Sequence, residues 1–80
     1  MARYFFHLRD GSDHLPDLEG RELPGLDEVR QVALTCARDT LSQELKDGRL
    51  DLAYRIDVED AQGMIVHTLP LREAFEVVRH

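Results

Sequence analysis

The 80-residue sequence contains one cysteine, no tryptophan, three prolines and five glycines. A single cysteine excludes an intramolecular disulfide, and no group of cysteines and histidines has the spacing of a structural zinc site. Without either kind of cross-link, so short a chain has a thin margin of stability, because folding removes only about 60% of its unfolded surface from water. Association with a second copy is the remaining way to bury more apolar surface.

Long apolar runs and positive charge are also scarce. The opening stretch MARYFFHLRD is interrupted by His7 and Arg9, and no run approaches the ~20 residues of a membrane span or resembles a signal peptide. We therefore expect a cytoplasmic protein with no membrane partner, a location that the lone cysteine also fits. Ten Lys and Arg residues against 16 Asp and Glu residues give a net charge of −6, which repels a phosphate backbone. Nucleic acid is not an expected partner.

With 42% hydrophobic and 32% charged residues, the composition is that of a folded protein, and the length indicates a single domain over residues 1–80. Residues 3–9 alternate as a strand that has two different faces. One face carries Tyr4, Phe6 and Leu8, and the other carries Arg3, Phe5, His7 and Arg9. A turn at residues 10–11 leads to a return strand within residues 15–23, and Pro16 restricts this strand to a short, bulged or edge position.

Residues 26–46 contain neither proline nor glycine and repeat apolar residues at helical spacing, so they predict a long helix. Gly48 is suited to the left-handed position that stops it. The apolar arc spans about 220°, whereas a helix on one sheet needs a stripe of only about 100°. The excess flank of Leu34, Leu41 and Leu45 must therefore meet another element or another subunit.

The last third of the chain predicts a hairpin followed by a short helix. Residues 54–59 alternate apolar and charged residues, as in a strand with one solvated face. Residues 60–63 form the loop, and residues 64–69 are apolar on both sides, as in a central strand. After Pro70, the helical spacing of Leu71, Ala74, Phe75 and Val78 favours a short helix over a further strand.

Together these elements predict an α+β fold. It consists of an antiparallel sheet of about four strands, in the order strand, strand, long helix, strand, strand, short helix, with the long helix covering one face. The sequence leaves the order of the strands within the sheet open.

Four segments, RYFFHLRDG, DLEGRELPGLDEVR, RIDVEDAQG and TLPLREAFEV, resemble a family of short bacterial proteins that is classified as a domain of unknown function and is frequent in alphaproteobacteria. The most specific part is the opening box of the RYxFHLRDG type. The resemblance implies a stand-alone cytoplasmic protein and brings no known activity or catalytic residue. A fainter similarity is to antitoxins with a partial ribonuclease-H-like fold, but the additional DNA-binding segment of those proteins is lacking.

The four histidines, at positions 7, 14, 67 and 80, could suggest a metal site or acid–base chemistry. None has the spacing of a metal ligand, although His7 and His67 would be neighbours if the first and last strands paired. Cys36 lies inside the apolar arc of the helix and is expected to be buried and unreactive.

The acidic residues also have simple structural interpretations. Those of the first loop, Asp10, Asp13, Asp17 and Glu19, lack the spacing of a calcium loop and fit turn chemistry. Those of the hairpin, Asp57, Glu59 and Asp60, fit a solvated strand face and a turn. We expect no catalytic residue, no metal site and no cofactor.

Two surfaces remain as candidate interfaces: the strand face of Arg3, Phe5, His7 and Arg9, and the helix flank of Leu34, Leu41 and Leu45. For the first surface, the alternative is that Asp57 or Glu59 across the sheet neutralises the arginines. The sequence thus predicts a non-catalytic interaction or regulatory module that forms a homodimer or binds a protein partner. An antitoxin-like or nucleic-acid-associated regulator is the alternative, and a small metal-binding or hydrolytic protein has the least support.

Overall fold

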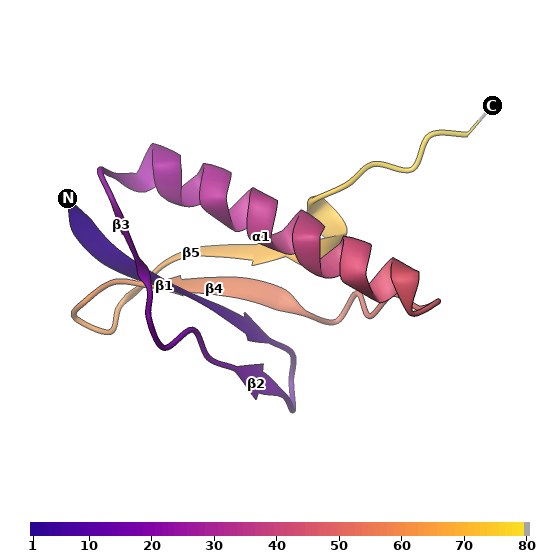
Figure 1. Cartoon of the computed structure of the whole chain (residues 1–80), viewed down its shortest axis with the longest axis horizontal. Helices are drawn as coiled ribbons and strands as arrows, with labels where there is room; N and C mark the ends of the chain where they lie inside the picture. Colours follow the sequence, from indigo (N-terminus) through magenta and orange to yellow (C-terminus); the bar gives the residue numbers. More distant parts are fainter. Residues whose placement is uncertain (80) are drawn as a thin grey trace.

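The structure, a computed structural model, describes residues 1–79 and shows one long helix lying across one face of an antiparallel sheet (Figure 1). The elements in chain order are β1 (Ala2–Arg9), β2 (His14–Leu15), β3 (Arg21–Leu23), α1 (Leu26–Lys46), β4 (Arg55–Glu59), β5 (Ile65–Pro70) and the single 3₁₀ turn η1 (Leu71–Glu73). The predicted α+β class is confirmed, with five strands in place of about four. His80, one of the four histidines considered above, lies outside the described residues.

Helix α1 has the bounds that the sequence predicts, because its end signals are local. Acidic residues occupy the first turn and Lys46 the last, which suits the helix dipole at both ends. Gly25 is the N-cap residue, and its carbonyl accepts a hydrogen bond from the amide of Val29. Gly48 has a φ of +84° and ends the helix in the left-handed conformation. Within residues 1–79, no helix combines the length and apolar character needed to cross a bilayer.

The two central strands of the sheet are β1 and β4. They pair antiparallel with Phe6 opposite Val58 and Leu8 opposite Ile56, while β5 pairs with the far side of β4. The expectation that residues 64–69 form a central strand is therefore wrong, since β5 is an edge strand among the described elements. Apolar side chains on a strand indicate whether its two faces are covered. They do not indicate whether another strand pairs with each of its edges.

The return segment after the first turn forms two short strands on the free edge of β1. Strand β2 pairs with the end of β1 and β3 with its beginning. Between them, the carboxylate of Asp17 accepts hydrogen bonds from the amide of Phe6 at 3.1 Å and from the amide of Gly20 at 3.1 Å. One aspartate side chain thus accepts the hydrogen bond of a backbone amide on the edge of β1, at a point that neither short strand reaches.

The hydrophobic core lies between α1 and the sheet. The helix contributes four buried residues at intervals of one turn, Val29, Ala33, Ala37 and Leu41. They pack against Ile56 and Val58 of β4 and against Leu71 and Ala74 after β5, with Tyr4, Phe6 and Leu8 of β1 partly buried beside them. The expected apolar face of the first strand is therefore the core face.

The predicted helix at the end of the chain is wrong beyond its first turn. Only η1 forms, and residues 74–79 contain no helix. A helix of about two turns gains too few hydrogen bonds to offset the cost of its nucleus, and Val77 and Val78 are β-branched residues that favour extended backbone. A hydrogen bond of 2.8 Å from Arg38 Nε to the carbonyl of Ala74 fixes the start of this segment. Beyond it the segment leaves the body of the molecule (Figure 1).

Of the five glycines, Gly20 has the least room for a side chain. Its φ is +71°, and a Cβ atom there would lie 2.8 Å from the ring of Phe5 and 2.9 Å from the carbonyl oxygen of Tyr4. We expect Gly20→Ala to lower the free energy of unfolding by about 2 to 4 kcal/mol, measured by urea denaturation. Gly48→Ala is the matched control, because it has a φ of +84° and open space around it. Equal losses in the two variants would contradict the packing role of Gly20.

Candidate functional site

The first predicted interface lies on the sheet face away from α1. Its side chains make contacts with other residues of the same chain. Arg3 is exposed but donates to the carbonyl of Glu19 at 2.6 Å and to a carboxylate oxygen of Glu22 at 3.3 Å. Phe5 is half-buried and stacks on His7, with ring centroids 6.4 Å apart. His7 is only 6% exposed, so the expectation that the whole residue set lies on an open surface is wrong for this residue.

Arg9 and Asp57 form the centre of an ionic network on the same face. Asp57 Oδ2 accepts hydrogen bonds from Arg9 Nη1 at 3.2 Å and from Arg55 Nε at 3.0 Å, while Oδ1 accepts from Thr68 at 2.9 Å. Asp57 is 4% exposed, so its predicted place on a solvated strand face is wrong. The residue lies on a central strand, and side chains of both neighbouring strands cover it. The alternative that a cross-strand carboxylate neutralises an arginine is confirmed for Arg9.

The ionisation of Asp57 reflects two opposing effects. Burial raises the pKa of its carboxyl group, but the hydrogen bonds from Thr68, Arg9 and Arg55 outweigh burial and lower the pKa overall. Asp17 shows the same balance. Burial raises its pKa, but hydrogen bonds from the backbone amides of Phe6, Gly20 and Glu19 have the larger effect and lower the pKa overall. Both carboxylates are therefore held in the charged form by the fold.

His7 has both ring nitrogens occupied. Nδ1 lies 3.1 Å from the backbone amide of Asp17 and accepts its hydrogen, so we assign the ring proton to Nε2, which donates to Glu59 at 3.0 Å. His67 is not a neighbour of His7, because β4 lies between β1 and β5. Across residues 1–79, no group of three or more His, Cys, Asp and Glu residues is placed to hold a metal ion.

An acidic hollow of about 360 Å³ lies beside the end of α1. Its lining residues are Asp10, Asp13, Glu44, Asp47, Arg49, Asp51 and Tyr54. Most of the carboxylates have local roles. Asp10 accepts a hydrogen bond from the amide of Ser12. Asp13 accepts a hydrogen bond from the hydroxyl of Tyr54, which raises the pKa of Tyr54 to about 12. Glu44 accepts the amide of Asp51 through Oε2, whereas its buried Oε1 atom has no partner among the described residues.

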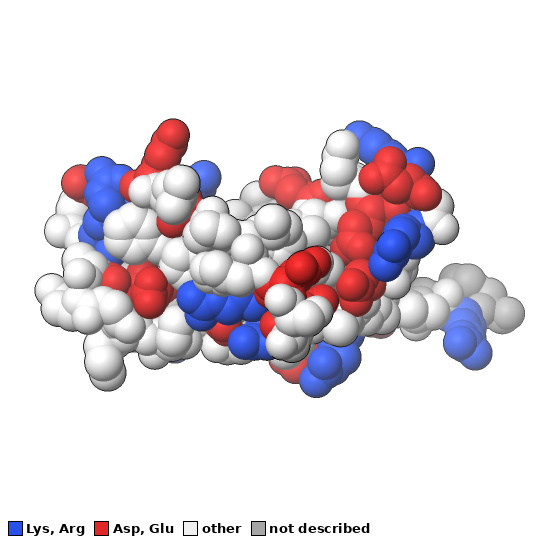
Figure 2. Space-filling view, turned by 90° about the horizontal axis from the view of Figure 1, so that it is seen from below, with Lys and Arg blue, Asp and Glu red and all other residues white. Residues whose placement is uncertain are grey.

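Charges of both signs share the face away from α1. Figure 2 shows blue Lys and Arg side chains interleaved with red Asp and Glu side chains, rather than gathered into a basic patch, on the part of this face that the structure describes. A phosphate backbone on this face would meet carboxylates as well as arginines.

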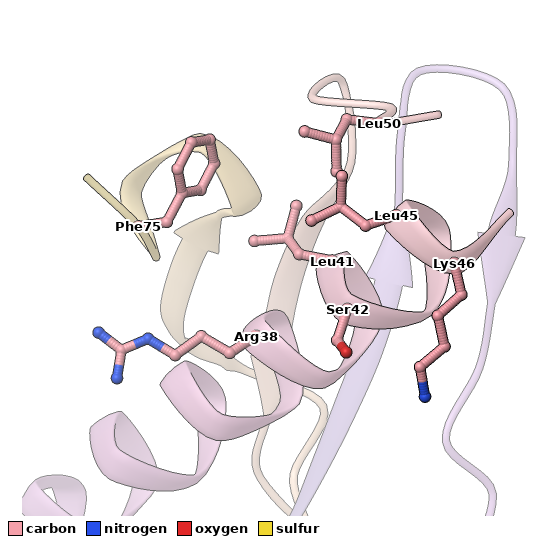
Figure 3. Close-up of a pocket in the computed structure, with 7 residues that line it drawn as sticks. All are labelled: Arg38, Leu41, Ser42, Leu45, Lys46, Leu50 and Phe75. Carbon is pink, nitrogen blue, oxygen red and sulfur yellow. The ribbon is translucent and has the colours of Figure 1, made fainter. Parts of the chain in front are cut away.

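Leu41 and Leu45 of the second predicted interface line an open apolar groove at the C-terminal end of α1. The groove has a volume of about 530 Å³ and is lined by Arg38, Leu41, Ser42, Leu45, Lys46, Leu50 and Phe75. Leu41, Leu45 and Leu50 point into one space, and Phe75 faces them from the other side (Figure 3). We call this feature the α1 groove.

The α1 groove has a buried floor and exposed walls. Leu41 forms the floor at 6% exposure, while Leu45, Leu50 and Phe75 are 61%, 40% and 38% exposed. Leu34, the third residue of the predicted flank, is half-buried against the core and does not line the groove.

The sequence interpretation missed Leu50 and Phe75 as groove residues. Leu50 follows the helix stop in a segment that predicts no element, and the helical spacing puts Phe75 on a helix that does not form. The only available signal was the density of apolar residues just after the helix, which does not show that they face Leu45.

Cys36 is half-buried on α1, and it is less enclosed than expected. Burial raises the pKa of its thiol, so little of the reactive thiolate is present at neutral pH.

The lowered pKa values of Asp57 and Asp17 predict a specific loss of stability in acid. Their contribution is fully present above the unfolded pKa of about 3.9 and is lost as the pH falls through the lower folded pKa, because the unfolded state then binds more protons. We expect Asp57→Asn to lower the free energy of unfolding at pH 7 by about 2 kcal/mol. It should also reduce the dependence on pH below about pH 4.

Urea denaturation between pH 2 and pH 7 measures both effects. The control is Asp39→Asn, which changes an exposed carboxylate on α1. If both variants keep the pH dependence of the parent protein, the ionic network does not control acid stability.

Comparison with known proteins identifies a family for most of the chain. A family model for a domain of unknown function matches residues 3–72. No curated protein and no solved structure matches the chain.

Proposed function

The chain belongs to the DUF6894 family, a domain of unknown function, and we propose that it is a non-catalytic interaction module that self-associates through the α1 groove. The observation that carries this proposal is the group of exposed apolar walls, Leu45, Leu50 and Phe75, around a buried leucine floor. Covering a half-exposed leucine or phenylalanine contributes about 1 kcal/mol. A two-fold interface covers two such grooves at once.

Three of the groups that could perform chemistry, His7, Cys36 and Asp57, are unsuited to it in this fold. Both nitrogens of His7 are hydrogen-bonded, and the pKa of the Cys36 thiol is raised by burial. Asp57 is paired with two arginines. For these three groups a binding role is better supported than a catalytic one, because a general base or nucleophile needs a free reactive atom that a substrate can reach.

The α1 groove is a better interface than the face of β1. The arginines of that face are paired with carboxylates or carbonyls of their own chain, and His7 is buried. The groove instead presents apolar side chains that would gain from being covered. The net charge of −6 and the mixture of charges in Figure 2 favour a protein partner over nucleic acid. The lone cysteine supports the cytoplasm as its compartment.

Leu45 provides the most direct test, because its exposed side chain can be changed without opening the core. We expect the parent protein to form a homodimer at micromolar concentration. Leu45→Lys should raise the dissociation constant at least tenfold, about 1.4 kcal/mol, by placing a charge in the interface. Sedimentation equilibrium over a range of concentrations measures this change.

Leu26→Lys is the matched control, since it adds the same charge to an exposed leucine at the opposite end of α1. The control should keep the parent dissociation constant. A parent protein that stays monomeric over the whole range would overturn the proposal, as would equal effects of the two substitutions.

A further inference from the structure

We propose that the α1 groove is filled by residues 76–78 of a second copy, and that two copies exchange these segments reciprocally. This inference rests on the proposed self-association and identifies the segment that occupies the groove. It follows from three features of the chain: an exposed apolar segment, a local sequence poorly suited to reversing direction, and a match of charge between segment and groove.

The segment after Phe75 carries apolar side chains that its own chain leaves uncovered. Val77 and Val78 are 67% and 64% exposed, and the segment points away from both the helix and the sheet (Figure 1). Two adjacent exposed valines next to an exposed apolar groove leave two apolar surfaces in water on one small molecule. Joining these surfaces removes both from water.

The segment is poorly suited to fill the groove of its own chain. Phe75 already forms one wall, so residues 76–78 would have to reverse direction immediately after it. A reversal takes about four residues and favours Gly, Pro, Asn or Asp, whereas the sequence from 75 to 79 is Phe-Glu-Val-Val-Arg. The two valines are stiff and favour extended backbone. Extended backbone over residues 76–78 reaches about 10 Å away from Phe75, and this reach suits the groove of a second copy.

The chemistry of the segment matches the chemistry of the groove. Successive side chains of an extended segment point to opposite sides, so one valine faces the leucines and the other faces the Phe75 wall. Lys46 lies at the margin of the groove and forms no ion pair among residues 1–79, while Glu76 adds a carboxylate at the start of the segment. In the exchanged pair, Glu76 of one copy lies near Lys46 of the other.

The first experiment removes the apolar side chains of the segment. We expect the double substitution Val77→Ser and Val78→Ser to raise the dissociation constant of the dimer at least tenfold in sedimentation equilibrium. The melting temperature of the monomer should be unchanged, because both valines are exposed. Leu18→Ser is the control, since it removes an apolar side chain that is 84% exposed in the connection between β2 and β3.

The second experiment exchanges the two charges. Lys46→Glu and Glu76→Lys should each weaken the dimer about threefold at low salt, and the two together should restore it, because the ion pair is rebuilt with opposite polarity. Lys46→Glu combined with Glu73→Lys has the same net charge and is the matched control. Glu73 is exposed on η1 and precedes the exchanged segment, so this second pair should not restore the dimer.

The outcomes separate this inference from the proposed function. If Leu45→Lys breaks the dimer while the valine and charge-swap variants leave it unchanged, the groove is the interface but another surface fills it, and the exchange is overturned. If the control pair restores the dimer as well as the swap does, the contact between Lys46 and Glu76 is overturned. A monomeric parent protein overturns both proposals.

Discussion

The carboxylate of Asp57 is the constraint on which the sheet face away from α1 depends. It is a charged group at 4% exposure, and it is stable there only because Arg9, Arg55 and Thr68 surround it with donors. These donors come from β1, β4 and β5, so one charge ties the three longest strands together across the sheet. Nearby, His7 joins Glu59 of β4 to the amide of Asp17, which extends the same polar layer toward the return segment.

The two faces of the sheet are therefore closed by different physical means. An apolar helix covers one face, with small residues such as Ala33 and Ala37 that let it approach closely. Hydrogen-bonded charges close the other face, which no described element covers. The molecule is only 18 Å across its shortest axis. At its C-terminal end, α1 extends past the packed core, and the α1 groove opens there with Leu45 on its exposed wall.

The sequence could predict what depends on neighbouring residues. The bounds of α1 follow from Gly25, Gly48 and an uninterrupted apolar repeat, and the hairpin loop follows from Asp60 and Gly63. Features that depend on contacts between residues far apart in the chain could not be predicted from the sequence. The alternation around Asp57 describes a solvated strand equally well until Arg9 is known to lie beside it. The groove was half predicted, because Leu41 and Leu45 share a helix with a visible period, whereas Leu50 and Phe75 join them only through the fold.

The pairing of β1 with β4 also determines when the protein can fold during its synthesis. His7 and Glu59 are 52 positions apart, and α1 lies between them in the chain. Strand β1 can meet β2, β3 and Asp17 early, because these partners lie within the first 23 residues. Its other edge has no partner until β4 has left the ribosome, and an unpaired edge is a template for other chains. The newly made chain thus passes through a stage at which a completed helix and an open strand edge coexist, and this stage ends when β4 pairs with β1.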